Sequence, residues 1–147
     1  MLISHFADTG FFIALLDQQD SLHSRAAAWA RATREPVAVT EYVLVETLNA
    51  LAGSPARGAA AELGDRVRQH SQSYLFVPAS PTLYERGLAL YREKPDKHWS
   101  LTDCTSFVVM RDRGITTAFA YDRHFEQAGF RALLREDPPG DAIAAGA

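Results

Sequence analysis

Short apolar stretches alternate along this chain with longer segments whose apolar residues recur at helical spacing. Residues 2–7 are mostly apolar and end at Asp8, and residues 11–16 form an unbroken apolar run, which predicts a buried strand followed by a helix. The full pattern predicts strands at residues 2–7, 37–39, 74–77, 115–121 and 130–134, and helices around residues 11–16, 21–34, 41–51, 56–70, 81–94 and 101–113, with a short one between Asp122 and Gly129.

Polar residues and a glycine mark where several of these helices begin and end. Ser21 and Thr40 can each accept a backbone hydrogen bond at a predicted helix N-terminus. Ser100 and Asp103 have the spacing of a capping box, in which each side chain bonds the backbone of the other residue. Gly114 can adopt the left-handed conformation that ends a helix.

The alternation of strands and helices predicts the fold class. Parallel strands joined by helices form a sheet that is covered on both faces, so we expect an α/β protein, a three-layer α/β/α sandwich with a short parallel sheet. A chain of 147 residues has about the size of one domain. We therefore predict one domain at residues 1–134 and a C-terminal tail at residues 135–147.

The composition excludes several classes of protein. Apolar residues make up 47% and charged residues 22% of the chain, which is typical of a globular protein and not of a disordered or fibrous one. The net charge of −3 is not that of a general nucleic-acid binder. The single cysteine, Cys104, can form no internal disulfide, and no apolar run reaches the roughly 18 residues of a membrane span. We expect a cytoplasmic protein without a membrane anchor.

Four acidic residues lie where a parallel sheet places its ligands, beyond the carboxyl ends of the strands. Asp8 and Asp122 each follow a predicted strand, Glu46 lies in the helix after the second strand, and Asp103 lies in the first turn of another helix. Carboxylates that lie close together must be protonated or bind a cation. Oxygen ligands suit Mg²⁺ or Mn²⁺, and the reaction such a site favours is hydrolysis of a phosphodiester bond.

Each acid also has a purely structural interpretation. Asp8 and Asp122 can cap the helices that follow them, and Asp103 belongs to the predicted capping box. Glu46 has the strongest case for function, because an acid in a mostly apolar helix must be paired, bound to a metal or exposed to water.

Other residues that could carry chemistry give weaker signals. The five histidines show no i, i+4 pair and no zinc-like spacing, so we interpret most of them as surface or core residues. Three arginines at the ends of predicted elements are candidate phosphate contacts: Arg111, Arg113 and Arg123.

Taken together, four ordered segments resemble the PIN domain family, in particular its VapC-type toxins. The segments are Phe6-Ala7-Asp8-Thr9, Val43-Leu44-Val45-Glu46-Thr47-Leu48, Trp99-Ser100-Leu101-Thr102-Asp103-Cys104 and Tyr121-Asp122-Arg123-His124-Phe125. The chain departs from many relatives at two places. It has Gly10 where they have a small hydroxyl residue, and it has Phe119-Ala120-Tyr121 where they have a threonine shortly before the last acid.

The resemblance implies a Mg²⁺- or Mn²⁺-dependent endoribonuclease that is frequently a homodimer and is inhibited by a cognate antitoxin. Its acidic positions match Asp8, Glu46, Asp103 and Asp122, with Thr9 and Ser100 as hydrogen-bonding support. Two alternatives remain open: an RNA-processing nuclease outside any toxin–antitoxin pair, and a non-catalytic module that binds RNA or a partner.

The charge balance changes when the four acids are assigned to a metal site. Without them the formal net charge of −3 becomes +1, so the acidity of the chain belongs mainly to the proposed site. A bound cation would turn this site from one that repels phosphate into one that attracts it. We therefore expect binding of RNA to depend on metal.

Overall fold

Five short parallel strands form the centre of the computed structural model, which describes residues 2–69 and 72–140. Their order across the sheet is β3-β2-β1-β4-β5, and every neighbouring pair is parallel. Sequence neighbours are thus also neighbours in space, except for the step from β3 across to β4. The strands are β1 (His5–Ala7), β2 (Val37–Thr40), β3 (Tyr74–Val77), β4 (Thr117–Phe119) and β5 (Arg131–Ala132).

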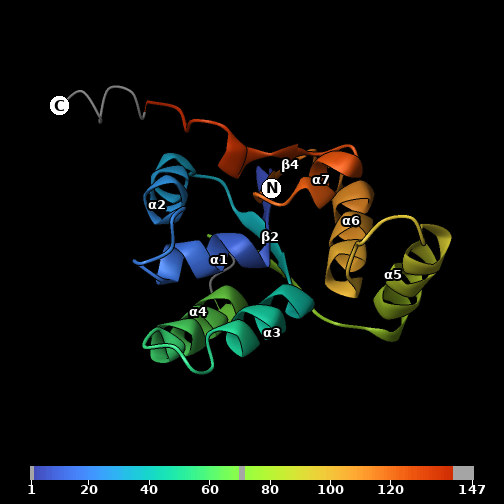
Figure 1. The fold of residues 1–147 in the computed structure, drawn as a ribbon, viewed down its shortest axis with the longest axis horizontal. Coiled ribbons are helices and arrows are strands. Elements are labelled where there is room, and N and C mark those ends of the chain that lie inside the picture. Colours follow the sequence, from blue (N-terminus) through green and yellow to red (C-terminus); the bar gives the residue numbers. More distant parts are fainter. Residues whose placement is uncertain (1, 70–71, 141–147) are drawn as a thin grey trace.

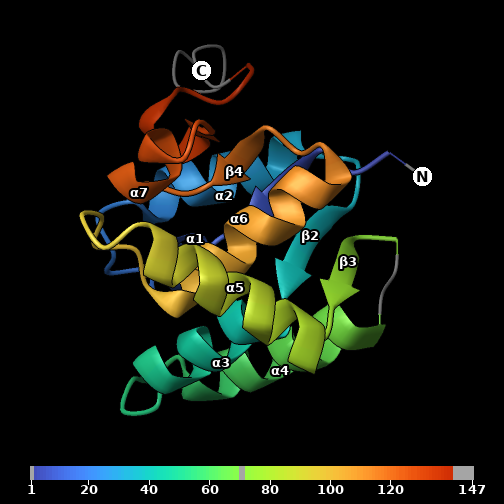
Figure 2. The ribbon, with the colours of Figure 1, turned by 90° about the vertical axis from the view of Figure 1, so that its right-hand side faces the viewer.

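Helices cover both faces of the sheet, so the expected three-layer α/β/α sandwich is confirmed. In Figure 1, α1 and α2 lie to one side of the strands and α6 and α5 to the other, with α7 near the end of α6. Figure 2 shows α5 and α6 side by side. The helices are α1 (Thr9–Leu16), α2 (His23–Ala32), α3 (Glu41–Ala50), α4 (Arg57–Gln69), α5 (Pro81–Glu93), α6 (Leu101–Arg113) and α7 (Arg123–Gln127).

The core is built largely from aromatic side chains that pack on the two faces of the sheet. Phe11 stacks on Phe119 with ring centroids 4.5 Å apart, and the edge of Phe107 meets Phe125 at 5.0 Å. Every residue of α6 from 103 to 110 is buried, because α5 covers the side of this helix that faces away from the sheet. Burial of such side chains stabilises the fold by about 1.5–3 kcal/mol each.

The parallel arrangement positions the candidate site. β1 and β4 are hydrogen-bonded neighbours, with Ala7 opposite Phe119, so the chain leaves both strands at the same edge of the sheet. Asp8 follows β1 directly and Asp122 follows β4 by three residues. The N-terminus of α6 reaches the same edge, where the side chain of Ser100 caps it as predicted.

Some predicted boundaries are wrong. Ser21 does not cap α2, which begins at His23 without a side-chain cap; the loop is held by Asp20, whose carboxylate accepts a hydrogen bond from the Leu22 amide. The strands observed within the predicted ranges 2–7 and 115–121 are shorter than predicted. An apolar run indicates that residues are buried, but not which of them form the hydrogen bonds between strands. The predicted strand at residues 130–134 contains only β5, and a 3₁₀ helix (Leu133–Arg135) follows it.

The end of the described chain packs against the domain. Trp29 Nε1 donates a hydrogen bond to the carbonyl of Glu136, and the Glu136 carboxylate pairs with Arg131. The domain boundary at residue 134 therefore stays a prediction. Residues 141–147 of the predicted tail lie outside the described residues. Residue 70, where the predicted helix at residues 56–70 ends, also lies outside them. In the described residues no helix is long and apolar enough to cross a membrane.

Candidate active site

Asp8 is the buried centre of the site. It is the residue before α1, but its side chain makes no capping hydrogen bond, so the structural interpretation of this acid is wrong. Burial raises the pKa of its carboxyl group to about 8, and the negative charges of Asp103, Glu46 and Asp122 act in the same direction. A carboxylate in this setting needs either a proton or a nearby cation.

Asp103 is buried in the first turn of α6, where it takes part in the predicted capping box. Ser100 Oγ accepts a hydrogen bond from the Asp103 amide at 3.0 Å, and Asp103 Oδ2 accepts one from the Ser100 amide at 3.0 Å. Burial raises the pKa of the Asp103 carboxyl group, although the hydrogen bond from the Ser100 amide and the contact with His124 act against the increase. Asp103 can therefore cap α6 and also serve in a functional site. Within the described residues, the hydrogen bonds that hold its carboxylate all reach Oδ2, so none of them uses Oδ1.

His124 joins two of the acids. Its Nδ1 lies 2.9 Å from Asp103 Oδ2 and 3.3 Å from Asp122 Oδ1. Asp122 also caps α7, because its Oδ1 accepts a hydrogen bond from the His124 amide at 2.9 Å. Metal-ligand spacing does not reveal this histidine, because it contacts carboxylates and is not part of a histidine pair. Its place two residues after Asp122 is a signal for the contact with that acid, but not for the contact with Asp103.

Glu46 lies in the second turn of α3. Its side chain is exposed and lines a shallow groove with Tyr42 and Thr102. It is therefore an acid that faces water, and its charge contributes to the raised pKa of Asp8. Among residues 2–69 and 72–140, no three His, Cys, Asp or Glu side chains lie close enough together to hold one metal ion.

The donors nevertheless fit a hard divalent cation. Carboxylate oxygens are the ligands that Mg²⁺ and Mn²⁺ prefer. The Thr9 hydroxyl beside Asp8 is buried and has no hydrogen-bond partner, so a polar group is missing around it. Burial, and after it the charges of the neighbouring acids, raises the pKa of Asp8, so its carboxylate form is unfavourable there without a compensating cation.

Only one of the three candidate arginines lies beside the acids. Arg123 begins α7 next to Asp122 and lies 3.8 Å from Glu126. Arg111 lies eight residues after Asp103 in α6, which places it about 12 Å further along the helix axis. Arg113 lines a different depression, with Arg86 and Asp112.

Two grooves border the site. The first, of about 620 Å³, lies beside Asp122 between the start of α1 and the start of α7; its lining includes Gly10, Tyr121 and Arg135. The second, of about 520 Å³, lies beside Ser100 and collects basic side chains from the end of α5 and the segment that follows it. These are Arg92, Lys94, Lys97 and His98.

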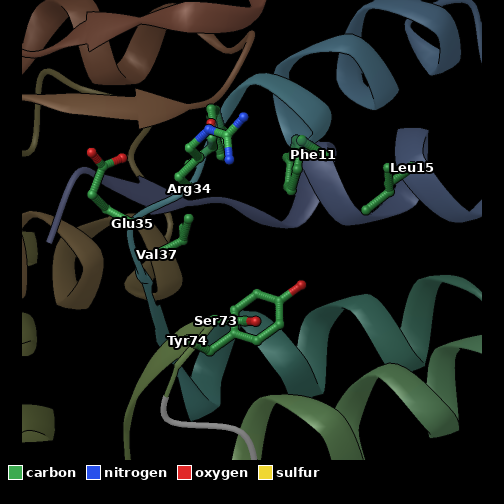
Figure 3. A pocket seen from close by; sticks show the side chains of 10 residues that line it. Phe11, Leu15, Arg34, Glu35, Val37, Ser73 and Tyr74 are labelled. Atoms are coloured by element: carbon green, nitrogen blue, oxygen red, sulfur yellow. The ribbon is translucent and has the colours of Figure 1, made fainter.

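A further cavity, of about 200 Å³, lies away from the acids at the amino ends of β2 and β3. Phe11 and Leu15 from α1 border it opposite Tyr74 from β3, with Arg34 and Glu35 at one side (Figure 3). Its lining contains none of the four acids, so it is separate from the candidate active site.

Comparison with known proteins agrees with this architecture. The sequence profile of the PIN domain family matches residues 6–131, and the chain belongs to this family. It is 35% identical over 130 residues to the 23S rRNA-specific endonuclease VapC20 of Mycobacterium tuberculosis, in strains H37Rv and CDC 1551; the match covers 85% of this chain and 94% of the relative.

Solved structures give the same result. The crystal structure of M. tuberculosis VapC20, described as a sarcin–ricin-loop-cleaving toxin, superposes with a TM-score of 0.80 and 29% identity over 88% of this chain and 98% of that one. FitAcB from Neisseria gonorrhoeae has a TM-score of 0.55 at 18% identity, covering 86% of this chain and 94% of that chain, and shows a shared fold alone. The relatives thus support a nuclease.

Proposed function

We propose that this protein is a Mg²⁺- or Mn²⁺-dependent endoribonuclease and the toxin of a type II toxin–antitoxin pair. The observation that carries the proposal is Asp8, a buried carboxyl group with a pKa raised to about 8 by burial and by three other acids at one sheet edge. Such an arrangement costs stability unless a cation compensates it. The similarity to VapC20 supports an RNA substrate.

The residues that would hold the metal are Asp8, Asp103 and Asp122, with Glu46 approaching from α3. A bound divalent cation supplies Lewis-acid activation of the attacking water and neutralises charge on the phosphate. The protein's own contribution is to hold the carboxylates in place: Ser100 and His124 bind one oxygen of Asp103, which leaves Oδ1 for the metal. Thr9 adds a hydroxyl without a partner at the same edge.

The substrate we propose is an RNA loop, with the sarcin–ricin loop of 23S rRNA as the first candidate because the relative is named for it. The basic groove formed by Arg92, Lys94, Lys97 and His98 would contact phosphates on one side of the site. Arg123 would contact a phosphate next to Asp122. We also propose that Arg111 and Arg113 contact phosphates of the RNA further from the cleaved bond.

We further propose a homodimer that acts in the cytoplasm and is inhibited by an antitoxin encoded beside it. Apolar side chains on two helices support a protein interface: Val45 and Leu48 on α3, and Tyr84 and Tyr91 on α5, are exposed. Sedimentation of the purified chain tests the dimer, and addition of the neighbouring gene product to a cleavage reaction tests inhibition.

The central experiment measures cleavage of a sarcin–ricin hairpin RNA by the purified protein. We expect cleavage with Mg²⁺ or Mn²⁺, none with a chelator, and loss of at least 100-fold for Asp8→Asn. Asp65→Asn, on the outer surface of α4, is the matched control and should cleave normally. Equal cleavage by the wild type and Asp8→Asn would refute the catalytic role of Asp8, and a wild-type protein that cleaves no RNA would refute the proposal and favour a binding module.

A further inference from the structure

The open groove beside Asp122 is large enough for a small ligand. Its volume of about 620 Å³ falls in the range of small-molecule sites, roughly 300–1,000 Å³. Ile13 and Leu22 line it with apolar groups, and Asp122 and His124 line it with groups of the active site. A Cβ atom added to Gly10 would meet nothing within 4 Å, so this wall of the groove is open.

An aromatic ring and a guanidinium group form a fixed stack at this groove. The Arg135 Cζ atom lies 4.0 Å from the centroid of the Tyr121 ring. Arg135 Nε donates a hydrogen bond of 2.6 Å to the Tyr121 carbonyl and lies 3.5 Å from a Glu126 carboxylate oxygen. The two planar groups are therefore held together before any ligand arrives, which lowers the entropy cost of binding.

The stack is more than core packing. Tyr121 is 46% exposed and lines the groove, so its ring is accessible to a ligand there. Both polar contacts of the Arg135 side chain among the described residues use Nε, the donor nearest the chain, so the outer nitrogens of the fork face away from these contacts. The nearby acid Glu126 is compensated by Arg123 and Arg135.

Aromatic rings and arginine planes are the groups on which proteins stack unpaired bases, and the guanidinium fork also binds phosphate. Tyr121 directly precedes Asp122, a proposed metal ligand, and Arg135 stacks on its ring in the same groove. We propose that Tyr121 and Arg135 form a nucleotide subsite, in which the Tyr121–Arg135 stack holds the unpaired base adjacent to the cleaved phosphodiester bond. This inference rests on the proposed ribonuclease function and adds how one base of the substrate is held.

The test combines protein variants with altered RNA. Steady-state cleavage of the sarcin–ricin hairpin RNA is measured for the wild type, Tyr121→Leu and Tyr121→Phe, and for Leu2→Ala, a control that removes an exposed apolar side chain before β1. We expect Tyr121→Leu to raise KM about tenfold and to change kcat less than about twofold, since stacking contributes to binding of the ground state. Tyr121→Phe keeps the ring and should keep KM, as should Leu2→Ala.

A set of RNAs with one abasic nucleotide on either side of the cleaved bond identifies the base. At one position, removal of the base should raise the KM of the wild type about tenfold and leave that of Tyr121→Leu nearly unchanged, because the contact is already absent. The subsite is refuted if the increases in KM from Tyr121→Leu and from base removal multiply at every position. It is also refuted if Tyr121→Leu has the KM of the wild type. In both cases the ribonuclease function stands. A wild-type protein that cleaves no RNA refutes the function itself.

Circular dichroism shows whether Tyr121→Leu folds. Should it not fold, the wild-type protein supplies the result through a 2-aminopurine base placed at each flanking position of an RNA whose cleaved linkage is replaced by a non-hydrolysable one, with Mg²⁺ present. Stacking quenches the fluorescence of this base on binding, and Tyr121→Phe should reproduce the quenching. Fluorescence that stays unquenched at both positions in the bound RNA overturns the proposal.

Discussion

His124 Nδ1 lies 2.9 Å from Asp103 Oδ2, although the two residues are 21 positions apart in the sequence. The contact links α7 to the first turn of α6, and the same nitrogen lies 3.3 Å from Asp122 Oδ1. A hydrogen-bond donor that bridges two carboxylates fixes their orientation and reduces their mutual repulsion. In metal sites such outer contacts have effects on metal affinity of about 10- to 100-fold.

Loss of this bridge should weaken metal binding more than it weakens the fold. His124→Ala is expected to lower the affinity for Mn²⁺ by roughly tenfold or more, measured by titration calorimetry. His124→Asn can place an amide donor near the position of Nδ1 and should recover most of the affinity. Equal affinity in the alanine variant and the wild type would show that the histidine has no positioning role.

The raised pKa of Asp8 predicts how stability depends on pH. The unfolded chain releases this proton near pH 3.8 and the folded protein near pH 8, so between these values the folded state binds the extra proton. Stability of the metal-free protein should therefore fall as pH rises through this window, by up to roughly 5 kcal/mol. Thermal unfolding in a chelator from pH 5 to pH 8 measures the effect.

Asp8→Asn is the control for that experiment, because it removes the titrating group and keeps its shape. The variant should show a flatter profile and, without metal, a higher Tm at pH 8 than the wild type. Addition of Mg²⁺ should raise the Tm of the wild type but not that of the variant. A wild-type profile as flat as that of Asp8→Asn would contradict the assignment of the raised pKa.

The sequence predicted the parts of the site that depend on local order. Asp8 directly follows a strand, and Asp103 has capping-box spacing with Ser100, so the position of both acids follows from nearby residues. The role of His124 could not be predicted in this way, because it arises from the packing of α7 against α6. No periodicity along the chain records such a contact.

Glu46 shows a second limit of the sequence pattern. Its apolar neighbours indicate a buried helix face, but two of them, Val45 and Leu48, are themselves exposed in the structure. The helix carries apolar residues on more than the side that faces the sheet, so neighbours in the sequence do not report the environment of Glu46. Burial depends on which side of α3 meets the core.

Gly87 permits the close approach of α5 to α6. A Cβ atom at this position would lie 2.5 Å from Cγ2 of Thr105, a buried side chain whose hydroxyl bonds the Thr102 carbonyl. Gly87→Ala should therefore destabilise the protein by about 1–3 kcal/mol. Gly64→Ala in α4, where nothing lies within 4 Å, should instead stabilise it by about 0.5–1 kcal/mol. Chemical denaturation of both variants tests the pair, and a stable Gly87→Ala protein would contradict the close packing.

The basic groove beside Ser100 predicts a salt dependence of RNA binding. Each phosphate contact on a single strand contributes about −0.7 to the slope of log K against log salt concentration. Lys94→Gln combined with Lys97→Gln should therefore make the slope shallower by about 1.4 and weaken binding at low salt. Arg111→Gln combined with Arg113→Gln removes equal charge at the far end of α6 and should change the slope less. Fluorescence anisotropy of a labelled hairpin RNA measures both slopes, and a larger change for the arginine pair would place the RNA along α6 and not across the basic groove.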